Sequence, residues 1–224
     1  MNEHFNRVDT PQTSALPVAE AGYPFIFAAA FATLVFALLD IVLLALAGLA
    51  AVFFITFFFR DPERFVPDTA NAVVSPADGR IVKTEKLEEN PYIEGPCIKI
   101  GIFMTIFDVH VNRVPCSGRV EKTRYQPGCF LSAGSEAASL KNEHQAIVLA
   151  SDNRARLCFV QVAGLIARRI ICRLKPGDSV NRGERFGMIC FGSRLDVYLP
   201  QDAGIEVRKG QKVKAGQTVL GHLP

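Results

Sequence analysis

The chain has 224 residues, 49% of them hydrophobic and 21% charged, and its formal net charge is +3. Such a length allows one sizeable domain together with an anchoring segment. The charge is too small and too evenly mixed to indicate nucleic-acid binding. Residues 1–59 contain one arginine against four acidic residues, so the basic excess lies in the rest of the chain, where it suits an anionic membrane surface.

The N-terminal part divides into a polar tail, residues 1–22, and a hydrophobic segment, residues 23–59. From Phe25 to Phe59 the one charged residue is Asp40. A single straight helix of that length would extend about 52 Å, whereas the hydrocarbon of a bilayer is about 30 Å thick. We therefore predict a helical membrane anchor that either crosses once, after Asp40, or folds back as a hairpin.

Two arginines, Arg60 and Arg64, follow the hydrophobic segment directly. Basic residues beside a membrane segment favour the cytoplasmic side, so we expect the protein at the cell membrane with its catalytic part in the cytoplasm. The six cysteines suit a reducing compartment, because none form a C-x-x-C pair that would bind zinc and most lie in apolar runs. We therefore expect free thiols and no metal site.

Residues 60–224 have the pattern of a mainly β domain. Apolar residues alternate from Ile98 to Ile106, and further short apolar runs are separated by Gly, Pro, Asn and Asp. The other predicted strands are Ile147–Ala150, Arg156–Val162, Arg169–Leu174, Arg185–Cys190 and Leu195–Leu199. One stretch, Ala133–Asn142, favours a helix.

A weak repeat occurs near the C-terminus. Lys175–Glu184 and Arg208–Gln217 share the order basic-x-Gly-x-x-Val-x-x-Gly, allowing for one shifted basic residue. This order is typical of the hairpins in lipoyl- and biotinyl-like domains, in which glycines permit tight turns and the valine packs inward. We therefore predict a lipoyl/biotinyl-like β-sandwich or barrel.

Three polar stretches are candidates for chemistry. Val73–Val82 contains Asp78 in a Pro-Ala-Asp-Gly turn, where the carboxylate either completes the turn or orients a histidine. Phe107–Pro115 alternates, so His110 shares a strand face with Asp108 and Asn112. Taken alone, a histidine on a strand is more often structural than catalytic.

The third stretch is Gly192-Ser193, between the apolar run that ends at Phe191 and an alternating run that begins at Leu195. A serine held beside a strained peptide bond can attack the carbonyl before it, since Gly192 has no side chain to block the approach. On the dipeptide alone, a plain turn between two strands is the simpler interpretation.

Taken together and in order, these stretches resemble the phosphatidylserine decarboxylase proenzymes of the short bacterial type. The matching segments are Phe58–Pro62, Ser75–Gly79, Asp108–Arg113, Gln161–Gly164, Ala167–Ile170 and Phe191–Ser193. The chain departs from the family pattern at four positions. Phe191 and Arg194 stand where longer relatives have leucine and threonine, Arg113 where they have a second histidine, and His144 where the family usually has arginine.

The resemblance implies self-cleavage between Gly192 and Ser193, giving a large chain, 1–192, and a small chain, 193–224. It implies that Ser193 becomes a covalently bound pyruvate, the pyruvoyl group, which serves in the decarboxylation of phosphatidylserine to phosphatidylethanolamine. His110 would be the general base for cleavage and Asp78 the carboxylate that orients it. The same resemblance allows a homodimer.

Three further residues receive weaker assignments. Asp108 is a second candidate for orienting His110, or for a role in decarboxylation. Arg168 and Arg169 are candidates to bind the carboxylate or phosphate of the substrate, although solvated strand charges explain them equally well.

Two other functions fit parts of the chain. A pyruvoyl decarboxylase of a soluble amino acid would need no hydrophobic segment. A membrane-anchored, non-enzymatic lipoyl-like adaptor would explain the anchor and the repeat, but it would not need Asp78, His110 and Gly192-Ser193 together.

Overall fold

The computed structural model describes residues 5–6, 17–131, 141–164, 169–190 and 193–224. These residues form two compact units. Residues 11–63 form a helical hairpin, and residues 64–224, together with the first ten, form a β-rich body. Each unit is described by itself below.

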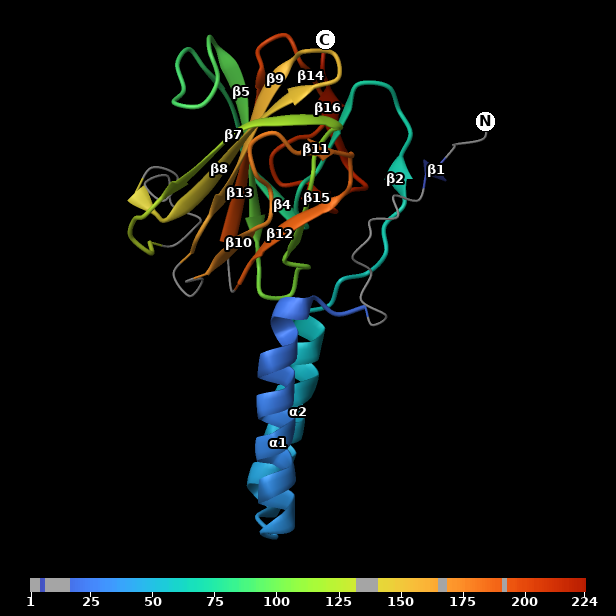
Figure 1. Ribbon diagram of the computed structural model, residues 1–224, viewed down its shortest axis with the longest axis vertical. Coiled ribbons are helices and arrows are strands. Elements are labelled where there is room, and N and C mark those ends of the chain that lie inside the picture. The colour runs from blue at the N-terminus through green and yellow to red at the C-terminus, as the bar shows by residue number, and fades with distance from the viewer. Residues whose placement is uncertain (1–4, 7–16, 132–140, 165–168, 191–192) are drawn as a thin grey trace. The chain divides into compact units, whose positions relative to one another are not determined.

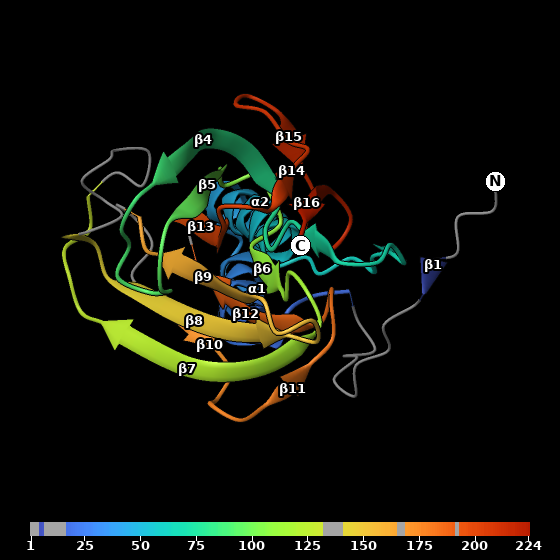
Figure 2. The ribbon, with the colours of Figure 1, turned by 90° about the horizontal axis from the view of Figure 1, so that it is seen from above.

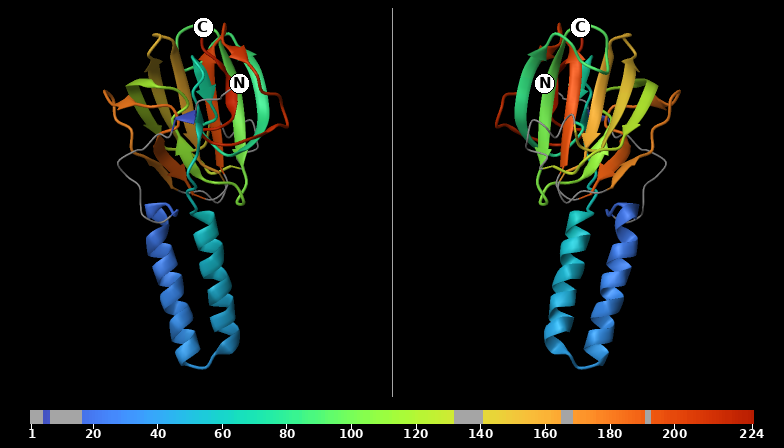
Figure 3. Two further views of the ribbon diagram at one scale, coloured as in Figure 1. Left: turned by 90° about the vertical axis from the view of Figure 1, so that its right-hand side faces the viewer. Right: turned by 90° about the vertical axis from the view of Figure 1, so that its left-hand side faces the viewer.

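The hairpin consists of a 3-10 turn, η1 (Glu20–Gly22), and two helices, α1 (Tyr23–Leu38) and α2 (Val42–Phe58). Figure 3 shows the two helices side by side and antiparallel. The chain reverses at Asp40, which has a φ of 56°, a left-handed conformation that asparagine and aspartate tolerate better than most residues. The helices pack closely at Gly48, where a Cβ atom would lie 2.4 Å from the Thr33 hydroxyl.

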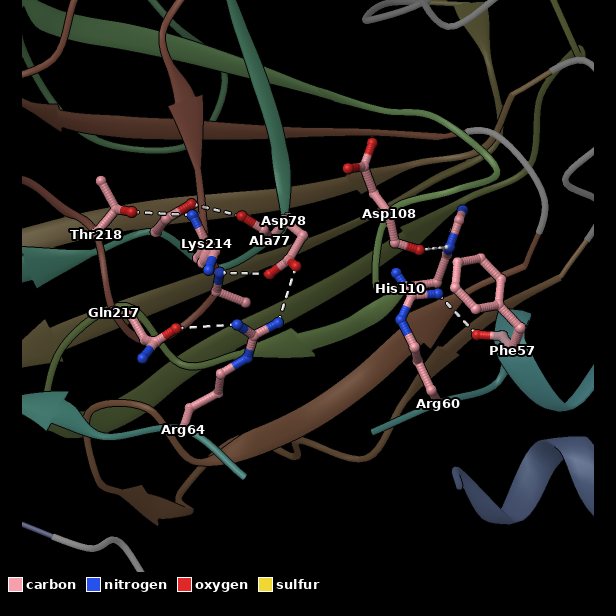
Figure 4. Close-up of polar contacts among 12 residues, drawn as sticks. Phe57, Arg60, Arg64, Ala77, Asp78, Asp108, His110, Lys214, Gln217 and Thr218 are labelled. Atoms are coloured by element: carbon pink, nitrogen blue, oxygen red, sulfur yellow. Dashed lines mark hydrogen bonds and ion pairs between the residues drawn. The ribbon is translucent and has the colours of Figure 1, made fainter. Parts of the chain in front are cut away.

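The two ends of the hairpin are joined by backbone hydrogen bonds. The Ala19 amide donates to the Phe59 carbonyl and the Asp61 amide donates to the Pro17 carbonyl, each at 2.7 Å. Arg60 donates to the Phe57 carbonyl at 2.7 Å and so caps the C-terminus of α2 (Figure 4). The chain therefore enters and leaves the hairpin at the same end. Among the described residues, one helix, Glu20–Leu38, is long and apolar enough to cross a membrane.

The body is mainly β, as predicted, and its largest sheet is curled (Figures 1 and 2). In sheet order, the eight strands are β11 (Ser179–Val180), β7 (Gly118–Gln126), β8 (His144–Ser151), β9 (Arg156–Val162), β13 (Ser193–Pro200), β5 (Cys97–Met104), β4 (Gly79–Leu87) and β15 (Lys212–Val213). The predicted helix Ala133–Asn142 lies almost wholly outside the described residues.

Two three-stranded sheets and one two-stranded sheet complete the described body. The first has the order β10 (Ile170–Cys172), β12 (Arg185–Ile189), β6 (Val111–Arg113); the second has the order β14 (Gly204–Ile205), β16 (Val219–His222), β3 (Ala72–Val74). β1 (Phe5–Asn6) pairs with β2 (Val66–Pro67).

The body contains the same structure twice. Residues 72–87 form β3 and β4, and residues 111–126, at a spacing of 39 positions, form β6 and β7. Gly79 and Gly118 begin the long strand of each copy with φ values of 153° and 155°, and at both a Cβ atom would lie 2.2 Å from a carbonyl oxygen of the neighbouring strand. Each long strand carries a bulge at the same place.

The C-terminal repeat predicted from the sequence belongs to this duplication. Gly177 and Gly210 both have positive φ, and Val180 and Val213 are both buried, as the pattern requires. The two copies place β11 and β15 at opposite edges of the eight-stranded sheet. The body is therefore built from two similar halves that meet at the centre of the sheet, where β9 of one half pairs with β13 of the other.

One face of the central strands forms the main core. Its fully buried side chains include Ile100, Ile102, Phe159, Phe186, Leu195, Val197 and Leu199. All six cysteines are free, as expected.

Candidate functional site

Ser193 is the first residue of β13, and β13 lies between β5 and β9. Its side chain is fully buried, and its hydroxyl donates to the Met104 sulfur at 3.3 Å. Met104 is also its register partner on β5. Gly192, the other half of the predicted cleavage site, lies outside the described residues.

His110 follows β5 after one tight turn. The Asp108 amide donates to the Thr105 carbonyl at 3.0 Å, and one Asp108 carboxylate oxygen accepts the Thr105 amide at 2.8 Å and its hydroxyl at 2.7 Å. The chain therefore leaves β5 at Met104, beside Ser193, and His110, six residues later, is fully buried.

The imidazole of His110 is held by a main-chain group. Its Nδ1 lies 2.9 Å from the carbonyl oxygen of Asp108 (Figure 4). Because a carbonyl oxygen can only accept, Nδ1 must donate, and the lone pair of the neutral ring is on Nε2. The ring is therefore fixed in the tautomer that a general base working through Nε2 needs.

Asp78 is bound elsewhere in the body. One carboxylate oxygen accepts from Arg64 Nη2 at 2.9 Å and the other accepts from the Ala215 amide at 2.7 Å (Figure 4). Arg64 also donates to Gln217 at 2.9 Å. Neither of the two groups that bind the carboxylate is His110, so its predicted orienting role stays a prediction.

The duplicated half shows what the position of Asp78 does in the fold. Its counterpart, 39 residues later, is Ser117, whose hydroxyl accepts the Arg182 amide at 3.0 Å. Asp78 accepts the Ala215 amide in the same way. In both halves the side chain at this position links the turn before the long strand to one of the two glycine-valine repeats. Asp78 also forms an ion pair with Arg64.

Among the described residues, the side chains of Asp108 and Arg169 form no hydrogen bond or ion pair with Ser193 or with the His110 imidazole. The Asp108 carboxylate closes its own turn and points away from the imidazole in Figure 4, so its contact with His110 is made by the backbone. Arg169 is exposed, and its carbonyl accepts the Cys190 amide at 3.2 Å. Arg168 lies outside the described residues.

Gln161 opens one of the family-like segments of the sequence, but sequence reasoning assigned it no role. Its side chain is fully buried and donates to Asn112 Oδ1 at 2.9 Å and to the Ile171 carbonyl at 3.2 Å. Asn112 is also fully buried. The available signal was a glutamine within the buried run Leu157–Val162, whose other residues are apolar.

The opposite face of β13 carries a buried charge network. Asp196 binds Arg194 Nε at 2.5 Å and Lys99 Nζ at 3.2 Å, and all three side chains are buried. Gly101 leaves room for the guanidinium, which would lie 2.6 Å from a Cβ atom there. Burial also raises the pKa of Tyr198, so its phenol stays neutral beside Asp196. This network fixes the strand immediately after Ser193.

The sequence profile of the phosphatidylserine decarboxylase family matches residues 52–221. The chain is similar to proteins named phosphatidylserine decarboxylase proenzyme in several bacteria. It is 51% identical to that of Desulfotalea psychrophila and 49% identical to that of Geotalea uraniireducens, over 93% of this chain and 97% of each relative. It is 44% identical to that of Geobacter metallireducens, over 95% of this chain and the whole of the relative. The chain therefore belongs to the phosphatidylserine decarboxylase family.

Proposed function

We propose that the chain cleaves itself at Gly192-Ser193 and then decarboxylates phosphatidylserine to phosphatidylethanolamine. The names of its relatives support the reaction and the proenzyme state. The observation that carries the proposal is the buried Ser193 hydroxyl at the start of a central strand. Ser193 pairs with Met104, the last residue of β5, and one tight turn after β5 comes His110, a buried histidine in a fixed tautomer.

Self-cleavage would use the chain's own groups. His110 takes the hydroxyl proton of Ser193, whose oxygen attacks the carbonyl carbon of Gly192. The peptide C–N bond breaks as the amine takes a proton, which leaves an ester. Loss of the α-proton of residue 193 expels the Gly192 carboxylate, and water then replaces the nitrogen, which leaves as ammonia.

The strand pairing supports a stable complex of the two products. The small chain, residues 193–224, supplies β13 to the middle of the eight-stranded sheet and β15 to its edge, and it also supplies β14 and β16. The Ala215 and Gln217 contacts with Asp78 and Arg64 add a polar link between the two chains. The two chains would therefore stay associated in one folded body after cleavage.

The residues around position 193 fit a pyruvoyl group. Ser193 supplies its carbon atoms, and the position is buried beside the apolar Met104. Such a group would supply an electron-withdrawing carbonyl for the loss of carbon dioxide from the serine headgroup. Arg169 is exposed and available to an anionic substrate, and Arg168 remains a second candidate.

The helical hairpin supports a membrane anchor. Its helices have 16 and 17 residues, which gives lengths of about 24 and 26 Å, and the Asp40 turn adds to both. This is close to the roughly 30 Å of hydrocarbon, and the turn would place the one carboxylate of the segment at the far headgroups rather than in hydrocarbon. We propose a two-crossing hairpin with both ends in the cytoplasm, on the side of Arg60 and Arg64.

Cysteine labelling in intact cells tests the hairpin. With the exposed Cys129 replaced by serine, Asp40→Cys should react with a membrane-impermeant maleimide before permeabilisation, and Glu20→Cys at the base should react only afterwards. Labelling of both variants only after permeabilisation would mean that the hairpin does not cross.

We propose further that the β-rich body has a lipoyl-like fold. The two glycine-valine repeats, each with a positive-φ glycine and a buried valine, support it. A non-enzymatic adaptor of that fold remains the second candidate function, because it needs the same repeats and the same anchor.

A denaturing gel separates the two functions. The enzyme should give two bands and the adaptor one, and Ser193→Ala should give one full-length band with no decarboxylation of phosphatidylserine in vesicles. Two bands from Ser193→Ala would remove this serine from the proposal.

A further inference from the structure

Asn112 and Gln161 form a buried carboxamide pair whose orientation is fixed by a third group. Gln161 Nε2 donates to the Ile171 carbonyl, which can only accept, so the amide of Gln161 cannot be reversed. The atom of Asn112 that the same nitrogen contacts must then be the acceptor Oδ1. Asn112 Nδ2 is left as a buried donor that has no hydrogen-bond partner among the described residues.

The duplicated half shows that the fold does not need this polar pair. Asn112 opposes Gly187 in β12, and its counterpart Val73 opposes Gly221 in β16. A Cβ atom at Gly187 would lie 2.0 Å from the Ile171 carbonyl oxygen, and one at Gly221 would lie 2.1 Å from the Gly204 carbonyl oxygen. The two sites are therefore built alike, but one holds a buried amide and the other a fully buried valine.

The counterpart of Gln161 is apolar as well. The ladder from Tyr125 leads through Gln145 to Gln161. In the other half the ladder from Lys86, 39 residues before Tyr125, leads through Ile98 to Leu199. A valine and a leucine thus occupy, in one half, the two positions that carry Asn112 and Gln161 in the other. Buried polar groups are normally satisfied, so this difference points to function rather than folding.

One member of the polar pair, Gln161, lies diagonally across from Ser193 on the neighbouring strand. Gln161 opposes Leu195, and Ser193 is two residues earlier on the same face of β13. Such diagonal neighbours have Cα atoms about 7 to 8 Å apart, a distance that a glutamine side chain can span. The corresponding position in the other half has no serine, since Ala155 stands there, one residue before β9 (Arg156–Val162).

We propose that Asn112 Nδ2 donates a hydrogen bond to the oxyanion that forms when Ser193 attacks the preceding carbonyl, and that Gln161 is its positioning residue. This inference rests on the proposed self-cleavage. The negative oxygen is bonded to the carbon that Ser193 Oγ attacks, and Asn112 Nδ2 belongs to the amide held by Gln161, the diagonal neighbour of Ser193. A donor left unpaired before the reaction stabilises the charge that appears during it.

Substitution by the residues of the other half gives the main test. Asn112→Val with Gln161→Leu should fold, because Val73 and Leu199 already occupy the equivalent sites, and its self-cleavage should slow by about 100-fold or more. Asn112→Asp should slow cleavage similarly, because it keeps the acceptor that Gln161 uses and loses the donor. Gln145→Leu, on the neighbouring strand, should cleave at the parent rate.

The measurement is the cleaved fraction against time on a denaturing gel, with and without hydroxylamine, which cuts esters but not amides. Hydroxylamine should not rescue the Asn112 variants, because the missing interaction precedes the ester. Cleavage of Asn112→Asp at the parent rate would overturn the role of Asn112. So would the formation of the ester in an Asn112 variant at the parent rate, seen as chain cleavage that appears only when hydroxylamine is added. A parent chain that never cleaves would instead refute the proposed function.

Discussion

Replacing Asp78 by asparagine separates a structural role of this carboxylate from a catalytic one. The carboxylate binds Arg64 and the Ala215 amide, and the ion-paired side chains are 9% and 12% exposed. Asparagine keeps an acceptor for Ala215 but loses the ion pair. A hydrogen bond to a charged group contributes about 1.5–3 kcal/mol, and the arginine left behind raises the expected loss to about 3 kcal/mol.

The assay is thermal unfolding in the Ser193→Ala background, where no variant can change the cleaved fraction. For a body of this size, about 3 kcal/mol should lower Tm by about 6–12 °C. Arg64→Gln should lower Tm by a similar amount, and the double variant should add little, because both changes remove one interaction. Ser117→Ala, the matched change in the other half, should cost about 1 kcal/mol.

The opposite pattern would refute this reasoning. If Asp78→Asn leaves Tm unchanged but nearly stops self-cleavage in the Ser193-containing chain, the carboxylate acts on His110, as the family resemblance implies. If Arg64→Gln lowers Tm and Asp78→Asn does not, the ion pair is not what stabilises this turn.

Three further outcomes are expected. His110→Ala should block self-cleavage on a denaturing gel, whereas Asp108→Asn should cleave within about tenfold of the parent, because the carbonyl that holds the imidazole remains; equal blocks would assign the effect to the carboxylate. Deletion of residues 1–59 should leave a soluble body that still cleaves, and a body that pellets with membranes after a salt wash would contradict this. Cys129, which is exposed, should react first with a thiol reagent in the native protein, since burial raises the pKa of Cys116 to about 12; mass mapping that finds Cys116 labelled first would be contrary to the structure.

The sequence predicted the features that depend on local chemistry. Alternation of apolar residues indicated a β-rich body, and the spacing of Gly177 and Val180 relative to Gly210 and Val213 indicated a repeat that the structure confirms. These signals are local because a turn needs its glycine and a strand needs its buried face.

The larger duplication was not predicted, although residues 72–87 and 111–126 are identical at five of sixteen aligned positions. These are Pro76 and Pro115, Gly79 and Gly118, Arg80 and Arg119, Lys83 and Lys122, and Thr84 and Thr123. The structure adds the shared backbone geometry, above all a glycine with a carbonyl 2.2 Å from where its Cβ would lie. Only the strand pairing reveals that Gln161 and Leu199 are counterparts.

The partners of the site residues were equally hidden. His110 is held by a backbone carbonyl, which every residue has, so no residue type could indicate it. The Ala215 amide that binds Asp78 lies 137 positions away in the chain. The hydrophobic segment left two arrangements open, because composition gives length and apolarity but not the direction of the chain after Asp40.

The intact mass of the purified full-length protein tests self-processing at Ser193 most directly. The account predicts two species, residues 1–192 and a 32-residue chain, 193–224, that is lighter by one ammonia than the same peptide with an N-terminal serine. A single mass equal to the uncleaved 224-residue chain in active protein would contradict it.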